Sequence, residues 1–200
     1  AAAESAEASA CEFFGRRFLE LGGTSGSFPT DTRDAWAVVL VEVSGSHDEV
    51  REGLDDLGAL AGRLRPRMVT KDAATVERLW SLRHAASPTI ARETADGRLS
   101  TQFIEDSVVP VEALASYLHG LDRILKAARL DAVVFGHAGD ANVHVNPLLD
   151  LREADWLPRA RRVLDEVAEL VSSLGGTLSG EHGDGRLRTP LVSRVWPARL

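Results

Sequence analysis

A short turn between two apolar runs constrains the fold of this chain more than any other feature. The runs at 131–135 and 142–148 are rich in β-branched residues, and a Gly-rich stretch at 136–141 separates them. Runs of this length favour strands, and a short connection containing Gly favours a hairpin. We therefore expect two adjacent antiparallel strands here, with Asp140 and Ala141 at the centre of the turn.

Helical and strand patterns alternate along the rest of the chain. Apolar residues recur at helical spacing, and Gly, Pro and Ser punctuate the segments. We expect helices at 1–22, 49–64, 72–87, 110–125 and 155–174, and strands at 36–43, 67–70 and 101–109. This order predicts an α+β fold with a mixed or antiparallel sheet and helices packed on one face, of the ferredoxin-like βαβ type. A helical and loop lead-in at 1–34 would precede one domain at 35–200.

The composition excludes several classes of protein. The net charge is −7 and no dense basic patch is visible, so we expect no nucleic-acid partner. The single cysteine, Cys11, permits no disulfide within the chain and is expected to be an ordinary thiol. No apolar run approaches the roughly 18 to 20 residues that span a bilayer, and the N-terminal stretch lacks the basic start of a signal peptide. We therefore expect a cytoplasmic protein without a transmembrane segment.

The turn places two histidines symmetrically. If Asp140 and Ala141 are its central residues, paired positions sum to 281, and His137 and His144 become direct cross-strand neighbours. Such neighbours have Cβ atoms about 4.5 to 5.5 Å apart, so both imidazoles could bind one divalent metal ion. The alternative is an inert, hydrogen-bonded histidine pair.

A second stretch, 179–186, reads Ser-Gly-Glu-His-Gly-Asp-Gly-Arg. Its glycines allow the backbone to approach a ligand closely. In an extended segment, Glu181 and His182 would point to opposite sides, so that one binds the metal while the other faces substrate. A site of His137, His144 and Glu181 would keep an open position, as catalytic zinc sites do, and leave His182 as a general base. The alternative is a solvated Gly-rich loop.

Together, HAGDANVH and GEHGDGR resemble the C-terminal domain of FAD-linked oxidases, the family of D-lactate dehydrogenase, glycolate oxidase and D-2-hydroxyglutarate dehydrogenase type. The resemblance implies oxidation of a small D-2-hydroxy acid to the 2-oxo acid, with hydride transfer to FAD. It implies that His137, His144 and Glu181 bind a divalent metal, Zn or Mn, and that His182 takes the hydroxyl proton. It also implies that Arg83 holds the substrate carboxylate and that Asn142 contacts the cofactor.

The resemblance further implies partners outside these 200 residues. Most of the FAD would be held by an upstream flavin-binding domain, and an iron–sulfur domain or subunit would accept electrons. The protein would be cytoplasmic or peripheral to the inner membrane. Two positions depart from the family pattern. Ala141 stands where Gly is usual, and Ile104 stands where hydroxyglutarate-type members have a substrate-binding Lys.

Two other functions compete with this interpretation. The same ligands could activate water in a metal-dependent hydrolase, or they could form a metal site in a non-catalytic interaction module. Flavin-linked turnover by the parent protein would separate both from the dehydrogenase.

Overall fold

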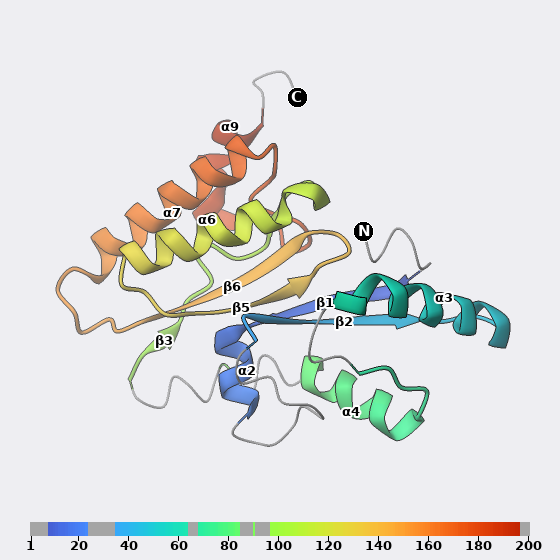
Figure 1. The fold of residues 1–200 in the computed structure, drawn as a ribbon. Helices are drawn as coiled ribbons and strands as arrows, with labels where there is room; N and C mark the ends of the chain where they lie inside the picture. Colours follow the sequence, from blue (N-terminus) through green and yellow to red (C-terminus); the bar gives the residue numbers. More distant parts are fainter. Residues whose placement is uncertain (1–7, 24–34, 64–67, 85–89, 91–96, 197–200) are drawn as a thin grey trace. The chain divides into compact units, whose positions relative to one another are not determined.

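The computed structural model describes residues 8–23, 35–63, 68–84, 90 and 97–196. The chain divides into two compact units, Ala1–Thr89 and Ile90–Leu200. We describe each unit by itself (Figure 1).

The described residues of the first unit form one antiparallel strand pair and three α-helices. The strands are β1 (Ala8–Gly15) and β2 (Ala37–Val43), with Cys11 opposite Val41. The helices are α2 (Arg16–Gly23), α3 (His47–Leu60), a 3-10 turn (Ala61–Arg63) and α4 (Ala73–His84).

The helix predicted at 1–22 is wrong for its central part, because residues 8–15 form β1. Pairing with β2 along the length of the strand overrides the helical propensity of the Ala-rich segment. The aromatic spacing that suggested a helix joins two elements, since Phe14 at the end of β1 packs on Phe18 in α2, with ring centroids 5.0 Å apart. Residues 1–7 of the predicted helix lie outside the described residues. Its predicted end at a Gly pair is confirmed by α2.

Capping residues determine where two helices of this unit begin. Ser46 forms a capping box with Glu49, which confirms the predicted start of α3. The strand predicted at 67–70 is wrong for 68–70, which form no strand. The hydroxyl of Thr70 instead accepts a hydrogen bond from the backbone N–H of Asp72, whose carboxylate accepts from Thr75 N–H at 2.9 Å. The segment therefore leads into α4 as a cap. Residue 67 lies outside the described residues.

The second unit holds the histidine-rich hairpin. Its strands are β3 (Leu99–Ser100), β4 (Ser107–Val108), β5 (Ala132–His137) and β6 (Asn142–Leu149). β6 pairs antiparallel with β3, β4 and β5. Its helices are a 3-10 turn (Val111–Ala113), α6 (Leu114–Ala127), α7 (Trp156–Ser173), α8 (Gly185–Arg188), a 3-10 turn (Thr189–Leu191) and α9 (Val192–Val195). The predicted α+β class with an antiparallel sheet is confirmed.

The two long helices of this unit pack side by side on one side of the β5–β6 hairpin (Figure 1). Each buries one apolar stripe, which includes Tyr117 and Leu121 in α6 and Val163 and Val167 in α7. Gly120 permits their close approach, since a Cβ there would lie 2.7 Å from the Leu170 side chain. The predicted amphipathic patterns therefore identify the helical part of the core.

The strand predicted at 101–109 is shorter in the structure, where only Ser107–Val108 is extended and paired. Asp106 lies just before it with φ +72°, a conformation that breaks a strand. At this break the Asp106 carboxylate is buried and accepts hydrogen bonds from the backbone of the 179–182 loop.

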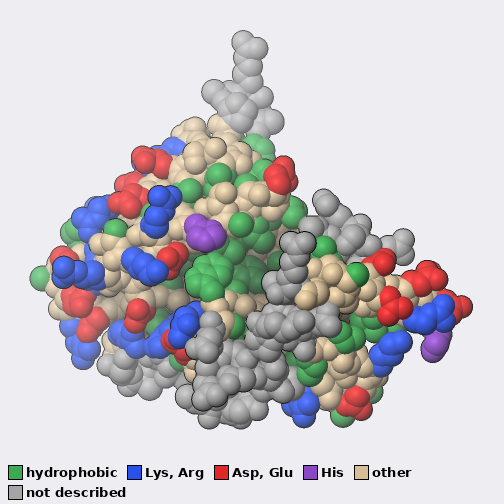
Figure 2. Space-filling model, viewed as in Figure 1, with side chains coloured by type: hydrophobic (Ala, Val, Ile, Leu, Met, Phe, Trp, Pro, Cys, Tyr) green, Lys and Arg blue, Asp and Glu red, His purple; other side chains and the backbone are tan. Residues whose placement is uncertain are grey.

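Charged side chains of both signs intermingle on the visible face of the molecule (Figure 2). In the described part of the chain, no helix combines the length and apolar character needed to cross a membrane.

Candidate active site

The β5–β6 hairpin carries two of the predicted metal ligands on one face. His137 ends β5 and pairs with Asn142, while His144 pairs with Phe135. Paired positions therefore sum to 279, so the predicted direct pairing of His137 with His144 is wrong. Both histidines still share a face, and their ring centroids are 5.3 Å apart in an edge-on arrangement.

The register differs because the turn has four residues, 138–141, rather than two. The backbone N–H of Asp140 bonds to the carbonyl of His137 at 3.3 Å, which starts the turn at the last residue of β5. Ala141 has φ +50° and is buried, so it occupies the left-handed conformation that favours Gly. This conformation explains why members of the family resembled usually have Gly at this position.

A buried carboxylate, Asp106, organises the second predicted stretch. It is fully buried and accepts hydrogen bonds from five groups of the chain. The donors are the Asn142 side-chain amide (2.9 Å), the Ser179 hydroxyl (3.0 Å) and the backbone N–H groups of Gly180 (2.9 Å), Glu181 (3.1 Å) and His182 (2.8 Å). Burial would raise the pKa of Asp106, but these hydrogen bonds outweigh it and lower the pKa to about 2.

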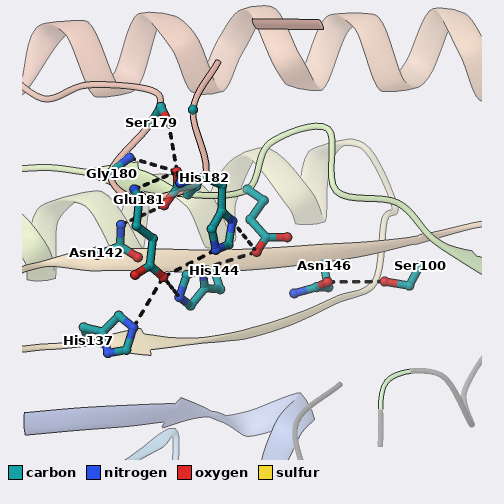
Figure 3. Close-up of polar contacts among 12 residues, drawn as sticks. Ser100, His137, Asn142, His144, Asn146, Ser179, Gly180, Glu181 and His182 are labelled. Atoms are coloured by element: carbon teal, nitrogen blue, oxygen red, sulfur yellow. Dashed lines mark hydrogen bonds and ion pairs between the residues drawn. The ribbon is translucent and has the colours of Figure 1, made fainter. Parts of the chain in front are cut away.

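The wrapping of this loop around Asp106 brings Glu181 and His182 together. Three consecutive N–H groups point at one carboxylate, so the segment is not extended. The prediction that the two side chains point to opposite sides is therefore wrong. Figure 3 shows both reaching toward the hairpin, with His182 Nε2 3.4 Å from Glu181 Oε1.

One oxygen of Glu181 lies at the centre of the site. Glu181 Oε1 is 3.6 Å from His137 Nε2 and 3.2 Å from His144 Nε2, in addition to its contact with His182 (Figure 3). Residues nearly forty positions apart in the sequence thus converge. The structure thus brings together the three predicted metal ligands, His137, His144 and Glu181, and the predicted base, His182.

A second carboxylate, Glu105, lies behind the histidines. Glu105 Oε1 is 3.3 Å from His144 Nδ1 and 3.4 Å from His182 Nδ1, and its side chain is buried. Glu105 was not among the site residues predicted from the sequence. A signal was available, because two acids inside an apolar segment at 103–109 are costly to bury without polar partners.

The donor set fits a divalent metal ion. Imidazole nitrogen and carboxylate oxygen are the ligands of catalytic zinc and of related metals. Ligand atoms from Asp106, His144, Glu181 and His182 lie within 4.8 Å of one another. We exclude Asp106 from the ligands, because both of its oxygens already accept hydrogen bonds from the chain. His144, Glu181 and His182 remain of that group, and His137 lies beside it, with Nε2 3.6 Å from Glu181 Oε1. The Glu181 side chain is half exposed, so an ion could reach it.

The predicted substrate-binding residue, Arg83, and the predicted cofactor-binding residue, Asn142, lie in different units. Arg83 belongs to α4 of the first unit, where its Nε donates to Glu12 at 2.7 Å. Asn142 begins β6, and its amide nitrogen donates to Asp106 while its amide oxygen is buried without a hydrogen bond among the described residues. Asn142 can therefore offer an acceptor to a ligand. Farther along the same face of β6, Asn146 accepts a hydrogen bond from Ser100 (Figure 3).

Comparisons with known proteins identify the family of this chain. A family model described as FAD linked oxidases, C-terminal domain, matches residues 1–199. The chain is 30% identical over 162 residues to glycolate oxidase subunit GlcD of Bacillus subtilis (strain 168), covering 79% of this chain and 33% of the relative. It is 34% identical over 117 residues to D-2-hydroxyglutarate dehydrogenase of Haemophilus influenzae, covering 58% and 11%.

A third relative extends across nearly the whole chain. D-lactate dehydrogenase of Archaeoglobus fulgidus is 27% identical over 194 residues, which is 96% of this chain and 40% of that protein. The chain spans about a third of the length of the glycolate oxidase subunits that it matches. The matched family model confirms the resemblance carried by the two His-rich stretches, and this chain belongs to the C-terminal domains of FAD-linked oxidases.

Proposed function

We propose that this chain is the substrate- and metal-binding part of an FAD-dependent dehydrogenase that oxidises a small 2-hydroxy acid. The observation that carries the proposal is the position of Glu181 Oε1, within 3.6 Å of a ring nitrogen on each of three histidines. The names of the relatives share one chemistry, since glycolate, lactate and 2-hydroxyglutarate all carry a hydroxyl beside a carboxylate.

The side chains of His144 and His182 differ in exposure, and this difference supports different roles for them. The His144 side chain is 4% exposed, so it suits a fixed metal ligand, together with His137 and Glu181. The His182 side chain is 47% exposed and suits contact with a bound substrate. Bound there, a divalent metal would polarise the substrate oxygens, and the FAD of the family would accept the hydride.

The steps assigned to this chain are binding, orientation and proton transfer. His182 Nε2 accepts the proton of the substrate hydroxyl as general base. The buried amide oxygen of Asn142 accepts a hydrogen bond from the cofactor or substrate. A two-pronged contact of Arg83 with the substrate carboxylate stays a prediction. The upstream flavin domain and an iron–sulfur electron acceptor stay predictions, as do the cytoplasmic location and the choice of Zn or Mn.

The test uses the full-length flavoprotein that contains this chain. We expect about one equivalent of divalent metal per flavin by mass spectrometry, and anaerobic bleaching of the oxidised flavin by glycolate, D-lactate or D-2-hydroxyglutarate. His144→Gln should lose both. His119→Gln is the matched control, since His119 is exposed on α6, and it should lose neither. Retention of metal and bleaching by His144→Gln would contradict the proposal.

One further variant, His182→Gln, separates a metal ligand from a general base when it is compared with His144→Gln. His182→Gln should keep the metal and lower kcat about 10²- to 10⁴-fold, as loss of a general base does. If His182→Gln instead loses the metal as His144→Gln does, His182 is a ligand and the assigned roles are wrong.

A further inference from the structure

Two parallel imidazoles lie between two carboxylate oxygens in this site. The rings of His144 and His182 are stacked, with centroids 5.2 Å apart and planes 14° apart. Each ring presents Nδ1 to Glu105 Oε1, at 3.3 and 3.4 Å, and Nε2 to Glu181 Oε1, at 3.2 and 3.4 Å. We infer that Glu105 is a positioning residue, which holds the proton of both rings on Nδ1 and directs both Nε2 lone pairs toward the metal and substrate.

The two carboxylates differ in burial, and this difference assigns their parts. The Glu105 side chain is 6% exposed, whereas that of Glu181 is 51% exposed. A ligand therefore approaches from the Glu181 side, and Glu105 lies on the closed side. An outer carboxylate that accepts the second N–H of a ligating histidine fixes the ring and its tautomer.

The backbone around Glu105 is held on both sides, so the carboxylate starts from a fixed place. The next residue, Asp106, accepts hydrogen bonds from five groups, as described above. The carbonyl of Glu105 itself accepts a hydrogen bond from the Arg188 guanidinium, which also binds the carbonyl of Leu178 at 3.2 Å. One short segment thus anchors the Ser179–His182 loop through Asp106 and orients the rings through Glu105.

At 3.3 and 3.4 Å the contacts from Glu105 Oε1 are longer than ordinary hydrogen bonds, and His144 Nδ1 is buried without a hydrogen-bond partner among the described residues. Bonds of this kind are often long in a ligand-free site and shorten when the ligand is bound. The inference rests on the proposed function for the identity of the ligand, but not for the orientation of the rings.

The experiment compares three substitutions in the full-length flavoprotein. Glu105→Leu fills the buried space but removes the acceptor, and Glu105→Gln keeps one acceptor oxygen in nearly the same place. Glu112→Leu, at an exposed acid before α6, is the control. Nitrogen-15 NMR of the histidine rings in the metal-free protein, at about pH 8, reads which ring nitrogen carries the proton. Competition with a chelator reads the affinity for Zn²⁺.

We expect both rings of the wild type to carry the proton on Nδ1. Glu105→Leu should lose that preference and bind Zn²⁺ about 10- to 100-fold more weakly, while Glu105→Gln recovers part of both and Glu112→Leu changes neither. A space-filling role would make Leu and Gln alike, which would overturn the inference. Because the wild type alone reports its tautomers, a proton on Nε2 of either ring would overturn it even if Glu105→Leu failed to fold.

The two proposals fail in different ways. If the wild type shows the expected tautomers but binds no Zn²⁺ and oxidises no hydroxy acid, the proposed function is wrong and the positioning by Glu105 stands. If metal and turnover are present but Glu105→Leu retains the wild-type tautomers and Zn²⁺ affinity, the positioning is wrong and the proposed function stands.

Discussion

Asn142 donates a 2.9 Å hydrogen bond from its side-chain amide to Oδ1 of Asp106, and both side chains are buried. This bond links the first residue of β6 to the residue that carries the Ser179–His182 loop. Gly180 fits against it, because a Cβ there would overlap the Asn142 amide. The two His-rich stretches meet through this junction, so its disruption should separate the candidate ligands.

The first prediction concerns the charge at the junction. Asp106→Asn should lower the free energy of unfolding by about 2 to 4 kcal/mol, because the variant replaces one acceptor oxygen by an amide that faces N–H donors. Urea denaturation measures the change. Asp122→Asn, at an exposed acid in α6, is the control and should change the free energy by less than about 0.5 kcal/mol. An equal loss in both variants would show that Asp106 is not an anchor.

The second prediction is a dependence of stability on acid pH. The pKa of Asp106 is about 2 in the folded chain, below its ordinary value of 3.8. A lowered pKa stabilises the fold above the unfolded value, and this contribution, on the order of 2 kcal/mol, is lost as the pH falls from about 4 to 2. The stability difference between wild type and Asp106→Asn, measured with a chelator present, should therefore shrink across this window. A difference that stays constant from pH 5 to 2 would contradict the assignment.

Much of the fold could be predicted from local pattern. The helices that bury one apolar stripe, α6 and α7, were predicted nearly at their observed bounds, as was the capped start of α3. β1 could not be, since an Ala-rich segment becomes a strand only because β2 pairs with it. Local propensity carries no information on that distant partner.

The site shows the same division. Residue types and spacing predicted a site formed by four residues, and the structure brings these residues together: His137, His144, Glu181 and His182. Their relative directions were mistaken for two reasons. The turn has four residues rather than two, and the wrapping around Asp106 depends on long-range hydrogen bonds. Glu105 was missed because its partners, His144 and His182, lie 39 and 77 positions away in the sequence.

The third prediction tests the close packing at Gly180. Its Cβ would also lie 2.6 Å from Val108 Cγ2, so Gly180→Ala should cost about 1 to 3 kcal/mol of unfolding free energy through overpacking. In the full-length flavoprotein, the same variant should lower the metal content. Gly58→Ala is the matched control, since a Cβ there meets nothing within 4 Å and α3 should gain about 0.5 to 1 kcal/mol. A Gly180→Ala variant as stable as Gly58→Ala would show that the loop can shift without cost.

The fourth prediction concerns the first unit, where Arg83 Nε donates to Glu12 Oε2 at 2.7 Å. The side chains are only 18% and 8% exposed, so removing either partner leaves a charge in a poorly solvated place. Arg83→Met and Glu12→Gln should each lower the free energy of unfolding, and the double variant should lose less than their sum, with a coupling of about 1 to 3 kcal/mol. A double-mutant cycle measured by urea denaturation gives that coupling. A value near zero would mean that the pair does not stabilise α4 against β1, and that the place of Arg83 depends on its other interactions.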